Sequence, residues 1–306
     1  MDNLQLVLFS SDIYDDSATG TLAFKAPNSE NMILDLLKHG IKCSTIKDDR
    51  KYPVSENVLV ISSLDDDLNR AVMFGVASAA YKEPKEIDSV KSSPVKETNS
   101  SPLYASSQLS FFSSEKATEL PLVIEGFDEI DYDFINRIFL RFHGLPVTIA
   151  ETERLIIREF TEEDSTDLYS ITDLFDSREK TESWLKDYIK NVYPFFDYGY
   201  WGVYEKSTGK LIGECGINSS EINGQYENEI GYIIAPASRK KGYASETISK
   251  IFEIAKERYE MKRVVALIEE GNTASVHTAE SLGMHFEARF AGKDYKHKLV
   301  YVKELG

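Results

Sequence analysis

The first half of the chain alternates short apolar runs with segments in which apolar residues recur every three or four positions. The short runs predict β-strands, and the recurring positions predict helices with one apolar face. Strands are expected at residues 4–9, 41–46, 57–62, 76–81 and 120–125, and helices at 29–40, 65–75 and 128–143. Because strands that alternate with helices pair in parallel, this half is expected to form a small layered α/β domain.

The second half of the chain has a different order of elements. A strand is expected at 153–158, followed by a helix capped by Thr161. Further elements are expected as a helix over 177–193, a hairpin of 200–206 with 210–217, a strand over 226–235, a helix from 243 to about 258, a strand over 263–269, a helix over 272–282 and a strand pair within 284–305. We therefore predict two domains, at 1–146 and 147–306.

Residues 83–119 differ in composition from the segments on either side. Ser, Pro, Lys, Glu and Asn dominate the stretch from Lys91 to Pro102. This composition is typical of loops and disordered segments, because it offers too little apolar surface to bury. We expect a low-complexity insertion in the first domain.

A strand, a basic turn and a helix follow one another at 231–258. The apolar strand 232–234 ends before Pro236, which has no N–H for a ladder. The turn contains Arg239, Lys240, Lys241 and Gly242, where the helix begins. The first N–H groups of a helix lack intrahelical partners and carry the positive end of its dipole. Cations and a glycine at that point predict a phosphate-binding turn.

This turn resembles a known family signature. Arg239-x-x-Gly242-x-Ala244 is similar to the (Q/R)-x-x-G-x-(G/A) pattern of the GNAT acetyltransferases, where it binds the pyrophosphate of acetyl-CoA. The stretch 153–164 resembles the opening of the Rim-type branch, which includes ribosomal-protein alanine acetyltransferases. Residues 272–284 resemble the family's N-x-x-S…L-G-F segment. The resemblance covers about 150–306 and implies an α+β GNAT fold with a mixed, mostly antiparallel sheet.

The resemblance implies acetyl-CoA as cosubstrate and a set of residues that bind it. That set is Ile233, Ile234, Ala235, Arg239, Lys240, Lys241, Gly242, Tyr243, Ala244, Ser245, Asn272 and Ser275. In the family, the Asn and Ser of the later segment contact the pantetheine and phosphate region. Asn272 also suits a helix N-cap, and we expect it to serve both purposes.

Acetyl transfer needs few catalytic side chains. An amine attacks the thioester carbonyl, a base takes its proton, and a backbone N–H near the end of strand 226–235 stabilises the oxyanion. In the family a glutamate on this strand often serves as the base, and Glu229 occupies that kind of position; the alternative is an ordinary strand acid. The family tyrosine that protonates the thiolate is replaced by Ala279. Tyr232 and His277 are the candidate substitutes, unless both are structural.

The first domain resembles a reduced haloacid-dehalogenase-like domain. Residues 58–71 are similar to that superfamily's late acidic motif, in which carboxylates after a strand hold Mg²⁺. The first strand should end in Asp-x-Asp, but Ser10 and Ser11 follow it, so a phosphoaspartate mechanism lacks its nucleophile. We interpret the acids at 65–67 as helix N-terminal residues, and we expect no metal.

Composition narrows the classes of partner. The formal net charge of the 306 residues is −16, which disfavours nucleic acid and anionic membrane surfaces as partners. Cys43 and Cys215 are far apart and have no metal-type spacing. Because the sequence also has no signal-peptide pattern and no apolar run of about 18 residues, a cytoplasmic location is expected.

Three functions remain open from the sequence. The first is an acetyl-CoA-dependent N-acetyltransferase that acts on a primary amine, such as a peptide N-terminus or a small amine, in a ternary complex. The second is a non-catalytic CoA-binding sensor, and the third is a phosphatase in the first domain. The aromatic stretch 193–201 is expected either to line an acceptor slot or to belong to the core. The sequence does not choose the acceptor or the oligomeric state.

Overall fold

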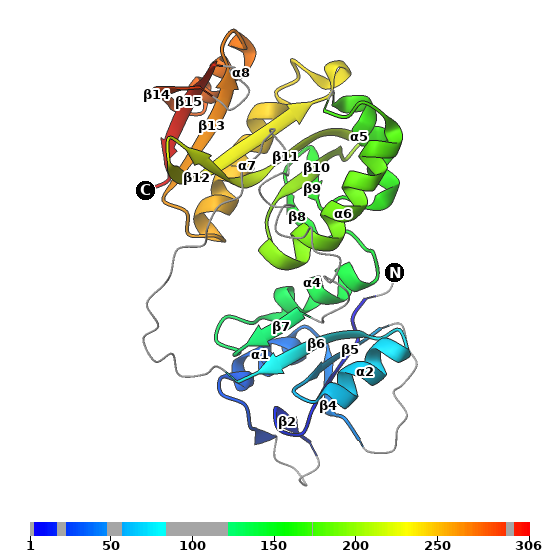
Figure 1. Ribbon diagram of the computed structural model, residues 1–306. Helices are drawn as coiled ribbons and strands as arrows, with labels where there is room; N and C mark the ends of the chain where they lie inside the picture. The colour runs from blue at the N-terminus through cyan, green and yellow to red at the C-terminus, as the bar shows by residue number, and fades with distance from the viewer. Residues whose placement is uncertain (1–2, 17–22, 48–56, 84–121, 173, 292–296) are drawn as a thin grey trace. The chain divides into compact units, whose positions relative to one another are not determined.

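The computed structural model describes residues 3–16, 23–47, 57–83, 122–172, 174–291 and 297–306. Two compact units divide the chain, with the change between Leu145 and Pro146 (Figure 1). Apart from Glu83, the predicted low-complexity insertion lies outside the described residues. None of the helices within these ranges is long and apolar enough to cross a membrane.

The first unit is built on a parallel sheet of five strands. Their order across the sheet is β4-β1-β5-β6-β7. The strands are β1 (Leu6–Phe9), β4 (Lys42–Thr45), β5 (Val58–Ser62), β6 (Ala77–Lys82) and β7 (Leu122–Glu125), and β2 (Tyr14–Asp15) pairs separately with β3 (Ala23–Phe24). The parallel pairing confirms the predicted layered α/β unit. The resemblance to haloacid dehalogenases stays a prediction.

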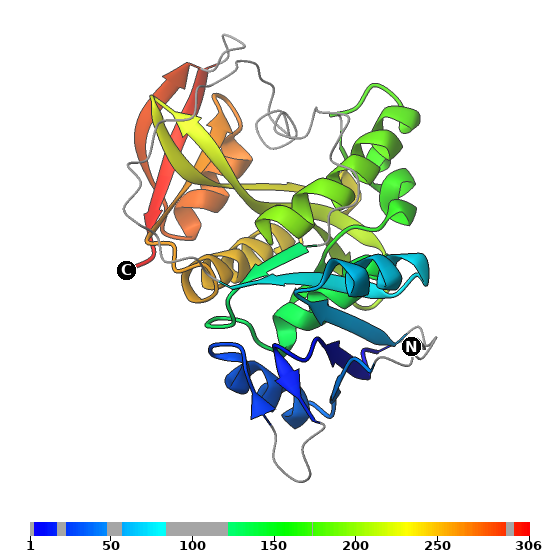
Figure 2. The same ribbon diagram turned by 60° about the horizontal axis from the view of Figure 1, so that its bottom comes forward.

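Helices cover both faces of this sheet (Figures 1 and 2). Alternate strand residues point to opposite sides, so a strand of consecutive apolar residues needs packing partners on both faces. The helices are α1 (Ser29–Lys38), α2 (Asp65–Met73) and α4 (Tyr132–Phe142). One face packs on α1 and α4 in a buried cluster with Val7, Phe9, Leu59, Ile61, Met32 and Phe139. The other packs on α2 through Leu8, Val58, Val60 and Ala71.

Two details of the first unit refine the sequence interpretation. The helix predicted from residue 128 begins only at Tyr132, because the Asp131 side chain caps it by accepting the Phe134 N–H at 2.8 Å. Ser10 is buried, and its hydroxyl accepts the Ser63 N–H at 3.2 Å. The acids at 65–67 form the first turn of α2, as predicted.

The second unit is built on a sheet of eight strands. Their order is β14-β15-β13-β12-β11-β10-β9-β8. The strands are β8 (Thr148–Glu151), β9 (Leu155–Arg158), β10 (Tyr200–Glu205), β11 (Leu211–Ile222), β12 (Gln225–Ile234), β13 (Arg263–Glu269), β14 (His285–Ala291) and β15 (His297–Glu304). All neighbours pair antiparallel except β12 and β13. The predicted mixed, mostly antiparallel sheet is confirmed.

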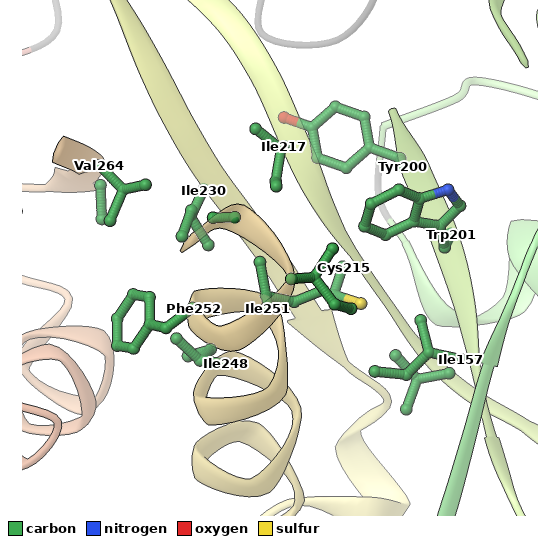
Figure 3. Close-up of a cluster of buried hydrophobic side chains, with 14 of the residues drawn as sticks. Ile157, Tyr200, Trp201, Cys215, Ile217, Ile230, Ile248, Ile251, Phe252 and Val264 are labelled. Carbon is green, nitrogen blue, oxygen red and sulfur yellow. The ribbon is translucent and has the colours of Figure 1, made fainter. Parts of the chain in front are cut away.

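The helices of the second unit pack on both faces of its sheet. They are η2 (Glu162–Asp164), α5 (Ser165–Ile171), α6 (Arg178–Phe196), η3 (Pro236–Ser238), α7 (Tyr243–Glu257) and α8 (Thr273–Ser281). On one face α7 packs through Ile248, Ile251 and Phe252 against Cys215, Ile217 and Ile230 (Figure 3). On the opposite face α5 and α6 pack against β9 and β10, in a cluster with Phe160, Leu168, Leu185 and Tyr204.

The second unit also departs from the predicted elements at its start. Residues 148–151, placed at the domain boundary by the sequence, form strand β8. Thr161 does begin a helical segment, but the first turn is the 3-10 helix η2. There the Asp164 carboxylate accepts both the Thr161 N–H and its hydroxyl, at 2.7 and 3.0 Å.

Candidate functional site

The parallel strands β12 and β13 pair at one position and then separate. The pairing places Glu229 opposite Val265, whereas β12 pairs with β11 as far as Ile234. The β12 and β13 ribbons diverge along their length (Figure 1). The divergence opens one side of β12 within the sheet.

The pairing of β12 with β11 determines which backbone N–H groups of β12 point into the gap beside β13. The Ala235 N–H donates to the Ile212 carbonyl at 2.8 Å. Because antiparallel neighbours alternate between bonded and non-bonded pairs, Ile233 also bonds to β11, while Tyr232 and Ile234 direct their N–H groups toward β13. Of the predicted trio of Ile233, Ile234 and Ala235, only Ile234 therefore offers an N–H to the gap.

The basic turn leads from β12 into α7 with two residues at positive φ. Lys240 has φ 62° and Gly242 has φ 82°, a conformation that favours glycine. The side chains of Arg239, Lys240 and Lys241 are exposed. Arg239 is anchored, because its Nε donates to the Ile234 carbonyl at 2.9 Å. The turn therefore holds three cations beside the open strand edge.

The first turn of α7 presents free backbone donors. Its first intrahelical bond runs from the Glu246 N–H to the Gly242 carbonyl at 3.1 Å. The N–H groups of Tyr243, Ala244 and Ser245 consequently have no intrahelical acceptor, and no side chain caps the helix at Gly242. Three N–H groups, the helix dipole and the cations fit the pyrophosphate of a nucleotide cofactor.

The Tyr243 side chain already has a hydrogen-bond partner within the protein, whereas its N–H has no intrahelical acceptor. The ring is buried, and the hydroxyl donates to the Glu205 carboxylate. This bond raises the pKa of Tyr243. A cofactor can therefore meet Tyr243 only through its backbone.

Arg154, the residue before β9, holds the basic turn in place, a function that the sequence analysis did not identify. Its Nη1 donates to the Lys241 carbonyl at 2.9 Å, and its Nη2 lies 2.6 Å from a Glu246 carboxylate oxygen. Its guanidinium also lies over the Tyr243 ring, 4.5 Å from the centroid. Arg154 belongs to the opening motif at 153–164, which is the signal that could have identified it.

Replacing Arg154 is expected to loosen the phosphate turn. Arg154→Met should weaken acetyl-CoA binding about 10-fold, because the Lys241 carbonyl loses a charge-assisted hydrogen bond. Calorimetric titration measures this change. Arg178→Met, at the exposed start of α6, removes the same charge elsewhere and should leave the affinity unchanged. Equal affinities in the two variants would contradict the bracing role.

The three predicted catalytic side chains lie in different surroundings. Glu229 and Tyr232 are three residues apart on β12, so they point to opposite faces of the sheet. Tyr232 faces the core under α7, and its buried hydroxyl has no hydrogen-bond partner among the described residues. His277 is exposed on α8, and Ala279 is buried. Glu229 and Tyr232 therefore lie on opposite faces of the sheet.

Glu229 lies where β12 and β13 separate, in a partly buried position. Burial raises its pKa, while the Ser220 hydroxyl, which donates to its Oε2, and the charge of Lys298 act in the opposite direction. Lys298 is itself buried on β15. A partly desolvated carboxylate of raised pKa is a stronger base than an exposed one.

Asn272 was predicted both to cap a helix and to contact the cofactor. The structure describes the capping at the start of α8. Its side-chain oxygen accepts the Ser275 N–H at 3.2 Å. This confirms the N-cap. Contact of Asn272 and Ser275 with a cofactor remains a prediction.

The aromatic stretch 193–201 belongs mainly to the core. Tyr193, Tyr200 and Trp201 are buried. Phe195 is 65% exposed and is the main exception. This outcome favours the core interpretation over an open aromatic slot.

Comparison with known proteins identifies the second unit. Residues 154–285 match the family model of the acetyltransferase (GNAT) domain. The match includes Arg154, Glu229, the basic turn and the start of α8.

Two individual proteins illustrate the likeness in sequence. YkkB of Bacillus subtilis, named an uncharacterized protein, is 36% identical over 86 residues, which are 28% of this chain and 50% of that protein. YoaA of Bacillus subtilis, named an uncharacterized N-acetyltransferase, is 28% identical over 152 residues, which are 45% of this chain and 84% of that protein. The chain thus spans half the length of YkkB and most of YoaA.

A solved structure is similar to about half of the chain. It is RimL, the ribosomal L7/L12 alpha-N-protein acetyltransferase, in complex with coenzyme A. The identity is 17%, the likeness covers 52% of this chain and 98% of that one, and the TM-score is 0.44.

Proposed function

We propose, from the premise that residues 154–285 form a GNAT acetyltransferase domain, that the second unit moves an acetyl group from acetyl-CoA to a primary amine. The observation that carries this proposal is the open edge of β12 beside the uncapped start of α7. The edge offers peptide-like hydrogen bonds to the pantetheine arm, and the helix start offers donors and positive charge to the pyrophosphate.

Two elements are proposed to bind different parts of the cofactor. Tyr232 and Ile234 offer backbone N–H groups toward the gap, where one of them can also meet the thioester oxygen. The pyrophosphate lies at the α7 start, against the N–H groups of 243–245 and the side chains of 239–241. Acetyl-CoA supplies an activated acyl group, so the protein needs chiefly to bind, orient and deprotonate.

The acceptor enters from the Glu229 face of the sheet. Glu229 takes one proton from the incoming ammonium, and the freed nitrogen lone pair forms a bond to the thioester carbonyl carbon. The carbon–sulfur bond breaks, and the thiolate leaves as the thiol after gaining the second nitrogen proton. The candidates for that last transfer are Tyr232, whose hydroxyl is buried on the face of the sheet opposite Glu229, and His277, which is exposed on α8.

The acceptor class follows from charge. The formal net charge of −16 attracts cations, so a peptide N-terminus, a polyamine or another small cationic amine suits the protein. Acetyl-CoA-dependent thiol release with a panel of such amines tests the proposed function. Tight CoA binding without turnover on any amine would favour the CoA-binding sensor instead.

The second unit is expected to act without the first. It has its own buried core, which includes Trp201, Cys215 and Ile251. A truncated protein of residues 147–306 should therefore retain acetyl transfer, with kcat/KM within about threefold of the full chain, a change of less than ~1 kcal/mol. Circular dichroism confirms its folding. Loss of turnover in a well-folded truncated protein would assign part of the acceptor site to the first unit.

A further inference from the structure

The face of the sheet that carries Glu229 also carries two uncharged polar side chains of β11. Asn218 is paired with Glu229 of β12, and Ser220 is paired with Glu227. Paired residues of antiparallel strands, and residues two apart on one strand, point to the same face. The nearest ionisable side chain of β11 on this face is Glu214, four residues before Asn218 and roughly 13 Å away along the strand. Asn218 and Ser220 therefore flank the proposed base from the neighbouring strand.

A hydrogen bond from Ser220 occupies one oxygen of the Glu229 carboxylate. The Ser220 hydroxyl donates to Oε2 of Glu229. A serine hydroxyl has a single proton, so this bond uses its only donor and leaves its oxygen to accept. Within the part of the chain that the structure describes, no group bonds to Oε1 of Glu229. The two oxygens of the proposed base are therefore unequal, since Oε2 is held and Oε1 is left to take a proton.

Asn218 supports the Ser220 hydroxyl from its other side. Its Nδ2 donates to the Ser220 oxygen over 3.5 Å, a long hydrogen bond. Asn218 is only 7% exposed, so its side chain has little room to turn away. The direction of donation is consistent along the chain from amide to hydroxyl to carboxylate. Asn218 thereby favours the conformation in which the Ser220 proton points at Glu229.

The charged groups on the other strands do not replace this hydrogen bond. Burial raises the pKa of Glu229, whereas its hydroxyl partner and the charge of Lys298 on β15 act in the opposite direction. Glu227, on the same face of β12, is engaged by Arg263 of β13, with Nε 3.2 Å from Oε2. Burial raises the pKa of Tyr200 on β10 well above its usual value, so its phenol stays neutral. A single hydroxyl is thus the direct partner of the buried carboxylate among the described residues.

We propose that Ser220 is a positioning residue for Glu229, whose carboxylate it holds through Oε2 in the ionised form while Oε1 takes the proton of the acceptor amine. This inference rests on the proposed acetyl transfer with Glu229 as the base. One proton moves from nitrogen to Oε1, and the Ser220 proton stays on its own oxygen. A hydrogen bond to the charged form of an acid stabilises that form, so removing the hydroxyl should raise the pKa of Glu229.

Ser220→Ala tests the inference through the pH dependence of kcat/KM, which reports on groups that ionise before the amine binds. The full chain is assayed from pH 5 to 9 at saturating acetyl-CoA, with whichever of an alanine-initiated peptide amide, spermidine and benzylamine it acetylates fastest. The acid limb should move to higher pH. The variant should lose about 10-fold at the acid end and less than about threefold on the plateau. A folding defect would instead lower the rate by one factor at every pH.

Two further variants serve as matched controls. Ser220→Thr keeps a hydroxyl on Cβ, and a β-branched residue suits a strand, so its acid limb should stay near that of the wild type. Ser219→Ala makes the same truncation at the next residue, which points to the opposite face and is also partly buried. Its profile should match the wild type.

A second measurement follows Glu229 without turnover. In protein labelled with carbon-13 at the glutamate carboxyl groups, the signal missing from Glu229→Gln belongs to Glu229, and its titration midpoint should rise in Ser220→Ala. An unmoved midpoint, or a kinetic loss of equal size at every pH, would overturn the inference, while wild-type turnover keeps the proposed function. A wild-type protein that acetylates none of the three amines would overturn the proposed function and this inference with it.

Discussion

Gly242→Glu is expected to lower the affinity for acetyl-CoA by roughly 1000-fold. A carboxylate at the start of α7 stands where the pyrophosphate is proposed to bind, and like charges about 4 Å apart near a protein surface repel by about 4 kcal/mol. The new side chain also cancels part of the positive field of Arg239, Lys240 and Lys241. Calorimetric titration of acetyl-CoA into the variant measures the loss.

Gly242→Asn is the control for the backbone. Gly242 has φ 82°, and asparagine tolerates this left-handed conformation better than other residues with a Cβ. A built Cβ at this position meets only Arg154 Nη2, at 3.4 Å, so space is available. The neutral variant should retain most of the affinity. If Gly242→Glu binds acetyl-CoA as tightly as the Asn variant, the phosphate does not lie at this turn.

Glu229→Gln is expected to lower kcat/KM about 100-fold at neutral pH. Glutamine keeps the shape and can still bond to Ser220, but it cannot take a proton from the incoming ammonium. CoA affinity should not change, because Glu229 is not in the phosphate turn. Steady-state kinetics with the best amine of the panel, together with a CoA titration, separates the two effects.

The dependence of activity on pH tests whether Glu229 must be deprotonated. Burial raises the pKa of Glu229, so the acid limb of the wild-type profile should lie above the range of an exposed glutamate. Activity should fall as pH falls through that pKa, since the base becomes protonated. The deficit of Glu229→Gln should shrink at high pH, where the amine, with a pKa near 8 for a peptide N-terminus, is already neutral.

Glu227→Gln serves as the matched control for that variant. Glu227 lies on the same face of β12, but its carboxylate is engaged by Arg263, with Nε 3.2 Å from Oε2. This variant should keep wild-type kinetics. Identical kinetics of Glu229→Gln and wild type across the pH range would make Glu229 an ordinary strand acid and leave deprotonation to water.

The parts of the site that the sequence predicted are those formed by residues close together in the chain. The phosphate turn is contiguous, and Pro236, the cations and Gly242 each have a local reason to be there. The cap at Asn272 is local in the same way. The predicted strand over 226–235 likewise implies that Glu229 and Tyr232 point to opposite faces of the sheet.

Long-range register explains what the sequence could not provide. Ser220 reaches Glu229 only once β11 and β12 are aligned, and strand register is set by tertiary packing. The bond from Arg154 to Lys241 likewise joins segments that are distant in the chain. Strand β8 was missed because its four residues, with intermediate or exposed side chains, carry a weak apolar pattern.

Mass spectrometry with an isotope-labelled acetyl group on acetyl-CoA tests the central claim most directly. The full chain, incubated with labelled acetyl-CoA and a primary amine, should yield an amine carrying the labelled acetyl group in an amount equal to the CoA thiol released. The Gly242→Glu variant should yield neither product. Thiol release by the wild type without any labelled amine, or no thiol release with any amine of the panel, would contradict acetyl transfer to an amine.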